Sequence, residues 1–298
     1  MTTWRVALLL WLLAPWVRAE LVVALSASVQ NSARGREIVF SGSLTNSSAT
    51  SKLYLNDIAT VLNSGSPTDF PFQPNSFFSN VPGVLLPNES YTDSEIFRVA
   101  LMAGAPAGDY RGTVTIRGGA DIFANDDLAA APYAVLSSAV VLAVSDASAS
   151  EVGPDPGAVT ITRSGGTDID LPVALATSGS AVAGSDYETL PLSITIPAGS
   201  SFANVTVTPI PNNIAQGDRT ATLTLGESSA YNLGTPIAGD IIIHDKPADA
   251  WRFGHFGANA NDPAAADEAD FDGDGISNLL EFALNLDPQN ASVTGLPT

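Results

Sequence analysis

The chain contains 298 residues, no cysteine, and an excess of acidic side chains that gives a formal net charge of −19 at pH 7. This length accommodates two domains and a small additional unit. The negative charge disfavours nucleic acid and anionic membranes as partners and favours divalent cations. The absence of cysteine excludes disulfide bonds and thiol chemistry, and it disfavours a zinc centre.

The composition indicates folded β-structure. Charged residues make up only 14% of the chain, whereas 45% is hydrophobic and Thr, Ser, Ala, Val and Gly are abundant. Hydrophobic content of this size can build cores, which argues against disorder. Short strands with small polar residues outside suit β-sandwiches better than helical bundles.

Residues 1–19 have the pattern of a secretion signal, with Arg5 as the positive start and an apolar run at 7–16. The run is shorter than the roughly 20 residues that span a bilayer, so we expect no transmembrane segment in the mature chain. Removing the signal removes Arg5 and Arg18 and makes the net charge −21. We therefore expect a protein that is secreted, extracellular or held at the cell surface.

Residues 20–145 form the first predicted domain, an Ig-like β-sandwich. Three runs alternate with a period of two, as half-buried strands do. Their predicted inward positions are Ile38, Phe40, Gly42, Leu44, Phe97, Val99, Leu101, Tyr110, Gly112, Val114 and Ile116. Further strand-like segments at 21–29, 52–58 and 133–144 bring the total to six or seven strands, enough for such a sandwich.

The segment 62–90 interrupts this pattern with five prolines and four phenylalanines. Two interpretations are open. A long ordered loop with aromatic residues can be a ligand surface, or it can close one end of the sandwich as a flap with its phenylalanines inside. We favour the flap, because phenylalanine lacks the polar tip that is usual in recognition loops.

Three acidic residues, Asp121, Asp126 and Asp127, follow a pair of glycines in the first domain. They would suit either a second calcium site or a solvated hairpin loop. We favour the hairpin loop.

Residues 146–247 form the second predicted domain, an antiparallel sandwich. Turn residues separate six strand-like runs. These runs are Ala158–Arg163, Leu171–Thr177, Ser193–Pro197, Asn204–Pro209, Thr220–Leu225 and Asp240–Asp245.

This second domain resembles the Calx-beta family, the sandwich domain of sodium–calcium exchangers, integrin β4 and many bacterial surface proteins. The similarity lies in the segments 149–151, 159–163, 179–187 and 241–245. Its most specific part is the Ala-x-Ala-Gly-x-Asp-Tyr unit that ends at Tyr187. The resemblance implies a sandwich with a calcium site at one tip.

In calcium-binding members of that family, acidic residues from several loops converge at the tip. The matching acidic positions here are Glu151, Asp186, Asp218 and Asp245. Four positions where acids are expected hold other residues, namely Pro211, Asn212, Gln216 and Arg219. Fewer carboxylates and an added cation weaken a calcium site, so we predict at most one weakly bound calcium in this domain.

Residues 248–298 form the last predicted unit, which contains the full oxygen-ligand pattern of an EF-hand calcium loop between residues 270 and 281. The predicted ligands are the side chains of Asp270, Asp272, Asp274, Asn278 and Glu281 and the backbone carbonyl of Ile276. Gly275 permits the sharp turn in the middle of the loop. Without a cation, these carboxylates would repel one another.

Helices are predicted on both sides of the calcium loop. A short helix at 264–269 leads in, and an exiting helix carries an apolar stripe. The stripe is Leu279, Phe282, Ala283 and Leu286, and its expected packing surface is Trp251, Phe253 and Phe256. The unit resembles the single-loop calcium units of dockerins and thrombospondin type 3 repeats.

No catalytic motif is apparent. The chain has only two histidines, His244 and His255, and it lacks a Gly-x-Ser-x-Gly elbow, a P-loop and a dinucleotide fingerprint. We interpret both histidines as structural. Paired carboxylates for glycosidic cleavage remain open, because a sequence does not show spatial pairing.

The sequence thus predicts an all-β chain of two antiparallel Ig-like sandwiches followed by a helix–calcium loop–helix unit. We interpret it as a non-catalytic calcium-binding structural or adhesion protein, with Ca²⁺ as its cofactor and surface glycans or other cell-surface proteins as candidate partners. One alternative is a carbohydrate-binding or docking component of an exported polysaccharide-degrading system. A hydrolase is the third hypothesis.

Overall fold

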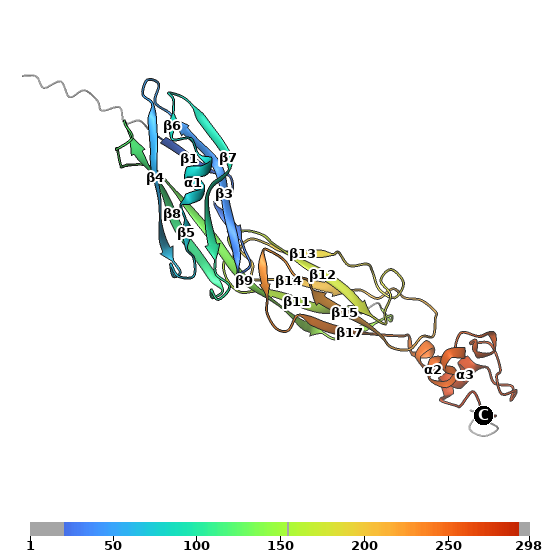
Figure 1. Cartoon of the computed structure of the whole chain (residues 1–298). Helices are drawn as coiled ribbons and strands as arrows, with labels where there is room; N and C mark the ends of the chain where they lie inside the picture. The colour runs from blue at the N-terminus through green and yellow to red at the C-terminus, as the bar shows by residue number, and fades with distance from the viewer. Residues whose placement is uncertain (1–20, 154, 292–298) are drawn as a thin grey trace, which may run out of the picture. The chain divides into compact units, whose positions relative to one another are not determined.

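The described chain is almost entirely β-structure, which confirms the predicted fold class. The computed structural model describes residues 21–153 and 155–291, so the predicted secretion signal lies outside the described residues (Figure 1). The chain groups into two units, the first made of residues 21–28, 37–102 and 110–134. The second contains residues 29–36, 103–109, 135–153 and 155–291.

The first unit contains two mainly antiparallel sheets and one short helix. Its strands are β1 (Leu21–Leu25), β3 (Arg36–Asn46), β4 (Leu53–Ser64), β5 (Phe72–Gln73), β6 (Val84–Leu85), β7 (Ser90–Leu101), β8 (Gly108–Gly119) and the first part of β9 (Asp126–Asp146). One sheet has the order β1-β3-β7-β5, and the other continues from β9 through β8 and β4 to β6. Because β9 extends through residue 146, the boundary predicted near residue 145 falls within a strand that contributes to both units.

Aromatic rings fill the core of the first unit. Phe40 stacks on Phe97 with ring centroids 4.7 Å apart, and Tyr133 packs edge-on against both. Every apolar side chain predicted to face inward in the three alternating runs is buried. The period-two alternation therefore identified this core correctly, because successive side chains of a strand point to opposite faces.

The phenylalanine-rich segment closes the first sandwich, as we favoured. Helix α1 (Asn75–Asn80) lies within it. Phe70 and Phe77 are buried, and the ring of Phe70 packs against Tyr110 at 5.2 Å. Phe78 is about half exposed, at 53%. Most of the aromatic surface of this segment thus stabilises the core.

The second unit is a sandwich in which all six predicted strands are present. Its elements are β2 (Val29–Asn31), the end of β9, β10 (Ser148–Ser150), β11 (Gly157–Arg163), β12 (Leu171–Gly179), β13 (Ser193–Ile196), β14 (Phe202–Val207), β15 (Arg219–Leu225), β16 (Tyr231–Leu233) and β17 (Ala238–His244). One sheet has the order β10-β17-β15-β12-β13, and the other joins β14, β11 and β9, with β2 and β16 also pairing with β9.

The short strands β10 and β16 were not predicted. Strand β10 pairs in parallel with β17, and β16 pairs in parallel with β9. Strand β10 begins two residues after β9 ends but belongs to the opposite sheet. The backbone N–H of Ile242 in β17 donates to the carbonyl of Ala147 at this crossing. Three-residue strands are too short to display a period, so their sequences carried no signal.

A single apolar cluster fills the second sandwich, including Val159, Ile161, Leu223 and Ile241. Arg163 is a buried cation in this sandwich, at only 2% exposure. Its guanidinium donates to the carbonyl oxygens of Ser200, Ile169 and Pro197 at 2.9–3.1 Å. These bonds compensate for burial of the charge, since a buried donor without a partner is costly.

The C-terminal part of the second unit is helical. Helix α2 (Pro247–Phe256) precedes the 3₁₀ turns η1 (Gly257–Asn259) and η2 (Pro263–Ala265), and α3 (Asn278–Leu284) follows the predicted calcium loop. The predicted helix at 264–269 is thus only a 3₁₀ turn, with no side-chain cap from Asp262. Across the described residues, no helix has the length and apolarity needed to cross a bilayer.

The predicted apolar stripe of the exiting helix is only partly correct. Phe282 packs against Trp251 with ring centroids 5.7 Å apart, as expected. Leu279, however, is 46% exposed. The buried positions of this helix are Asn278 and Glu281 instead, because the helix turns its polar side toward the calcium loop.

Replacing Phe40 with alanine should destabilise the first sandwich by roughly 3–5 kcal/mol, the usual cost of a large aromatic deletion in a core. Its neighbour Val39 is 37% exposed, so Val39→Ala is the matched control and should cost less than about 1 kcal/mol. Urea unfolding followed by circular dichroism measures both values. Equal losses in the two variants would contradict the assigned core.

Candidate metal centre

The calcium loop at 270–281 follows η2 and ends inside α3, and its backbone wraps around its own acidic side chains. Asp270 Oδ1 accepts hydrogen bonds from the N–H groups of Gly273 (2.8 Å) and Asp274 (3.1 Å), and its Oδ2 accepts from Gly275 (2.8 Å). Gly275 has φ +91° and Gly273 has φ +78°, in the region where side chains are strained. The sequence prediction that Gly275 makes the turn is therefore confirmed.

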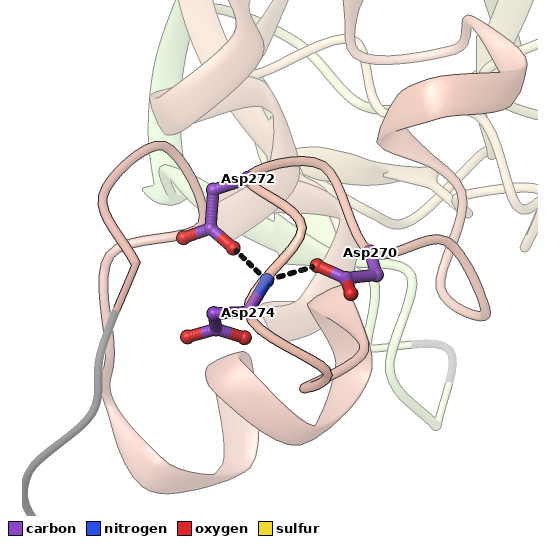
Figure 2. Close-up of side chains that lie close together, drawn as sticks. All are labelled: Asp270, Asp272 and Asp274. Carbon is purple, nitrogen blue, oxygen red and sulfur yellow. Dashed lines mark hydrogen bonds between the residues drawn. The ribbon is translucent and has the colours of Figure 1, made fainter.

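Three aspartates converge inside this loop. Asp270, Asp272 and Asp274 each offer a carboxylate oxygen, and these oxygens all lie within 4.8 Å of one another (Figure 2). Calcium binds oxygen at 2.3–2.6 Å, so two oxygens on one ion are at most about 5 Å apart. The three aspartates thus have the spacing of a calcium ligand set without further movement.

Glu281 completes the acidic group from the first turns of α3. Its side chain is fully buried, and neither carboxylate oxygen has a hydrogen-bond partner. Burial, together with the negative charges of Asp272, Asp274 and Asp270, raises the pKa of Glu281 to about 7. A buried ionised carboxylate without donors is strongly disfavoured, so the group either holds a proton or needs a cation beside it.

The two remaining predicted ligands, Asn278 and Ile276, are both buried and make different hydrogen bonds. Asn278 is 1% exposed, and its amide Nδ2 donates to the carbonyls of Ala264 and Ala266 at 3.1 and 2.8 Å, while its Oδ1 is buried without a partner. Its amide thus ties the entering turn to α3, a role that the ligand pattern did not reveal. The backbone N–H of Ile276 donates to Asp274 Oδ1 at 2.8 Å, and the Ile276 side chain is buried.

The donor set therefore fits a calcium ion. Carboxylates from Asp270, Asp272, Asp274 and Glu281 supply the hard oxygen ligands and the negative charge that calcium prefers. The two buried oxygens of Glu281, which lack hydrogen-bond partners, support a cation here independently of the sequence motif. When bound, calcium would supply positive charge and cross-link α3 to the preceding loop.

The weaker site predicted at the tip of the second sandwich has a different chemistry. Glu151, Asp186 and Asp245 are buried, but protein groups occupy their oxygens. Asn212 Nδ2 donates to Glu151 Oε1 at 2.7 Å, and Gln216 Nε2 donates to Asp186 Oδ1 at 3.1 Å. The two amides that replace expected acids thus bind the carboxylates that remain.

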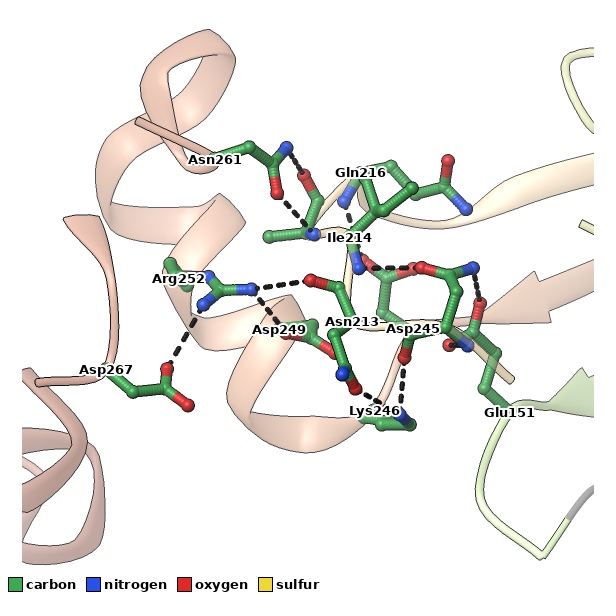
Figure 3. A network of polar contacts seen from close by, with 12 residues as sticks. Glu151, Asn213, Ile214, Gln216, Asp245, Lys246, Asp249, Arg252, Asn261 and Asp267 are labelled. Carbon is green, nitrogen blue, oxygen red and sulfur yellow. Dashed lines mark hydrogen bonds and ion pairs between the residues drawn. The ribbon is translucent and has the colours of Figure 1, made fainter. Parts of the chain in front are cut away.

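Backbone N–H groups and the ammonium group of Lys246 make the remaining polar contacts at this tip. Asp245 Oδ2 accepts from the backbone N–H of Gln216 at 2.9 Å (Figure 3). The same oxygen accepts from the backbone N–H of Gly217 at 2.8 Å. Lys246 Nζ donates to the carbonyl of Asn212 and to Asn213 Oδ1. The fourth predicted ligand, Asp218, is separate from these, because it is exposed and binds Nδ1 of His244 at 2.9 Å.

Two other candidate groups take up structural contacts. His255 lies 3.6 Å from Asp287, and its ring packs against Trp251. In the first unit, Asp121 accepts hydrogen bonds from the two backbone N–H groups of its own turn, and Asp127 pairs with Arg117 at 2.8 Å. Within 21–153 and 155–291, Asp270, Asp272 and Asp274 form the one acidic trio with metal-site spacing.

Comparison with known proteins identifies no family. No protein-family model and no curated protein matches the sequence. Among solved structures, the domain pair "CBD12 from CALX1.2" is 18% identical, covering 35% of this chain and 45% of that chain, with a TM-score of 0.31. This chain thus spans less than half of that fragment.

Two further solved structures show similarity at the same level. The "Apo-form Calx CBD1 domain" is 19% identical over 36% of this chain and 97% of that chain, with a TM-score of 0.31. The "D00-D0 domain of Intimin" is 13% identical over 76% of this chain and 99% of that chain, with a TM-score of 0.32. Scores this low establish no common fold, so we derive function from the residues of this chain alone.

The raised pKa of Glu281 predicts a pH dependence for the metal-free C-terminal unit. Between about pH 4.5 and 7, Glu281 is protonated in the folded unit and ionised in the unfolded chain. The free energy of unfolding is therefore highest below pH 4.5 and falls as the pH rises through 7. The loss amounts to roughly 3 kcal/mol. Trp251 is the only tryptophan after residue 19, so urea unfolding in a chelator, followed by its fluorescence, measures this unit.

The matched control is Glu281→Gln, which cannot ionise. The difference in stability between the original chain and this variant should change by that amount from pH 4.5 to 8. A pH-independent difference would show that Glu281 is not held protonated in the metal-free unit.

Proposed function

We propose that this chain is an exported, non-catalytic structural or adhesion protein that binds one calcium ion in the loop at 270–281. The observation that carries the proposal is the buried carboxylate of Glu281, with both oxygens unpartnered, beside three converging aspartates. The ligands would be Asp270, Asp272, Asp274 and Glu281, with the carbonyl of Ile276 and Asn278 as the remaining oxygen donors.

Calcium would act by stabilising a unit with little core of its own. Among the described residues, the buried apolar cluster around α2 consists of Ala215, Phe256, Ala260 and Ala265, with Trp251 packed on it. A core of this size supplies little hydrophobic stabilisation. Free calcium at a hundred times its Kd would add about 2.7 kcal/mol. An exported protein without disulfides would gain its rigidity here from the ion.

A structural rather than catalytic role agrees with the remaining chemistry. Each histidine contacts an aspartate, His244 with Asp218 and His255 with Asp287, and neither contact is with a serine nucleophile. Two sandwiches with buried, well-packed interiors suit a spacer or adhesive surface. The burial of Phe70 and Phe77 weighs against the glycan-binding alternative, since these rings would be its main contact surface.

Calcium titration of the mature chain should give a stoichiometry near one. Both Glu281→Gln and Asp270→Asn should weaken binding by about a hundredfold or more, because each removes a ligand charge next to a divalent ion. The matched control is Glu268→Gln, which changes an exposed carboxylate just outside the loop and should leave the affinity nearly unchanged. Isothermal calorimetry in a calcium-depleted buffer measures all four.

A different location for the ion would appear in the same experiment. Binding that survives Glu281→Gln but is lost in Asp245→Asn would place calcium at the tip of the second sandwich. No binding to the unaltered chain would remove the calcium proposal.

Export is tested separately. Expression of the full sequence in a bacterium should release or display a chain that begins at Glu20, because the predicted cleavage follows Ala19. Mass spectrometry of the extracellular and cytoplasmic fractions measures this. An intact chain that still carries residues 1–19 in the cytoplasm would contradict the proposal of export.

A further inference from the structure

The loop at 212–217, which connects β14 to β15 in the second sandwich, forms part of the C-terminal helical unit. Ala215 is 1% exposed and belongs to the same apolar cluster as Phe256, Ala260 and Ala265. Asn261 holds this loop residue on both sides: its Oδ1 accepts from the Ala215 N–H at 2.9 Å, and its Nδ2 donates to the Ala215 carbonyl at 2.8 Å. The small core of the helical unit is therefore incomplete without residues 212–217, called the sandwich loop below.

A buried arginine makes a second connection. Arg252 on α2 is 9% exposed and donates through Nη2 to the carbonyl of Asn213 in the loop at 3.1 Å (Figure 3). The same guanidinium binds Asp249 at 2.6 Å and Asp267 at 3.1 Å. Arg252 thus links the sandwich loop to the segment that enters the calcium loop. Close to this point, Phe253 packs over Gly217, where an added Cβ would lie 2.7 Å from the ring.

The acidic tip of the sandwich fixes the other side of this loop. The carboxylates of Glu151, Asp186 and Asp245 accept hydrogen bonds from Asn212 and from the side chain and backbone of Gln216. In this arrangement the buried carboxylates have protein donors, in contrast to Glu281. The tip therefore presents Ala215 to the helices without needing a metal ion.

Contacts also connect Ala215 to the proposed calcium site. Phe271, the second residue of the calcium loop, packs edge-on against Phe256 at 5.0 Å between ring centroids. Phe256 shares the apolar cluster with Ala215. In parallel, the backbone N–H of Leu279 in α3 donates to the carbonyl of Asp267, whose side chain binds Arg252. Both ends of the calcium loop thus contact residues that hold the sandwich loop.

We propose that the loop at 212–217 is a docking site for the C-terminal unit of the same chain, and that docking and calcium binding at 270–281 stabilise each other. This inference rests on the proposed calcium site. Because linkage is reciprocal, an ion that orders the calcium loop also strengthens the contact with Ala215, and loss of that contact weakens calcium binding. The acidic tip acts here as a metal-free support for a calcium-binding neighbour.

Amide hydrogen exchange of the mature chain tests the first half of the proposal. The N–H of Ala215 bonds to Asn261 in the helical unit, whereas the N–H groups of Gln216 and Gly217 bond to Asp245 in the sandwich. Saturating calcium should therefore slow exchange at Ala215 by about tenfold or more and change the two neighbouring amides much less. In Glu281→Gln, calcium should leave exchange at Ala215 unchanged.

Calcium affinity in a docking variant tests the second half. Asn261→Ala removes both bonds to Ala215 and lies outside the calcium loop, so it should raise the calcium Kd by up to about tenfold. The matched control is Asn259→Ala, which removes an exposed asparagine side chain two residues away and should leave the Kd unchanged.

The outcomes separate this inference from the calcium proposal. Slower exchange at Ala215 together with a weaker Asn261→Ala variant would support the coupling. Calcium binding that leaves Ala215 exchange unchanged, or that is equally tight in Asn261→Ala, would overturn the inference while the calcium site stands. Failure of the unaltered chain to bind calcium would overturn both.

Discussion

The C-terminal unit depends on one electrostatic constraint, the burial of Glu281 beside three aspartates. A carboxylate with no hydrogen-bond donor is costly inside a protein, and the like charges of Asp270, Asp272 and Asp274 increase that cost. The fold keeps this arrangement because the two glycines of the loop let the three aspartates converge, while α3 buries Glu281 where their charges act on it. A divalent cation would resolve the constraint, which is why we propose calcium for this loop.

The tip of the second sandwich also contains buried carboxylates, but there protein groups satisfy them. There, Glu151, Asp186 and Asp245 are also buried, but amide side chains and backbone N–H groups bind them. Asn212 and Gln216 supply donors at positions where the Calx-beta resemblance leads us to expect acids. A carboxylate that already has two or three protein donors has little to gain from an ion, so the two acidic regions serve different purposes.

Much of the fold could be predicted because its signals are local. Period-two alternation identified the buried residues of β3, β7 and β8, and the spacing of Asp270, Asp272, Asp274 and Glu281 identified the candidate site. The predictions failed where an element is short or its environment comes from elsewhere. Strands β10 and β16 have three residues each, and Leu279 is exposed because the polar side of its helix faces the calcium loop.

By itself, the sequence determined the strand pattern and the four-carboxylate spacing, since both follow from side-chain direction along a few consecutive residues. Only the tertiary structure decided which carboxylates lack donors. It showed that Asp218 turns to His244 rather than to the tip, and that Ala215 completes a core some forty residues farther along the chain. Such contacts join residues that are distant in the sequence. No local pattern encodes them, because the folding of the intervening chain decides whether the two residues meet.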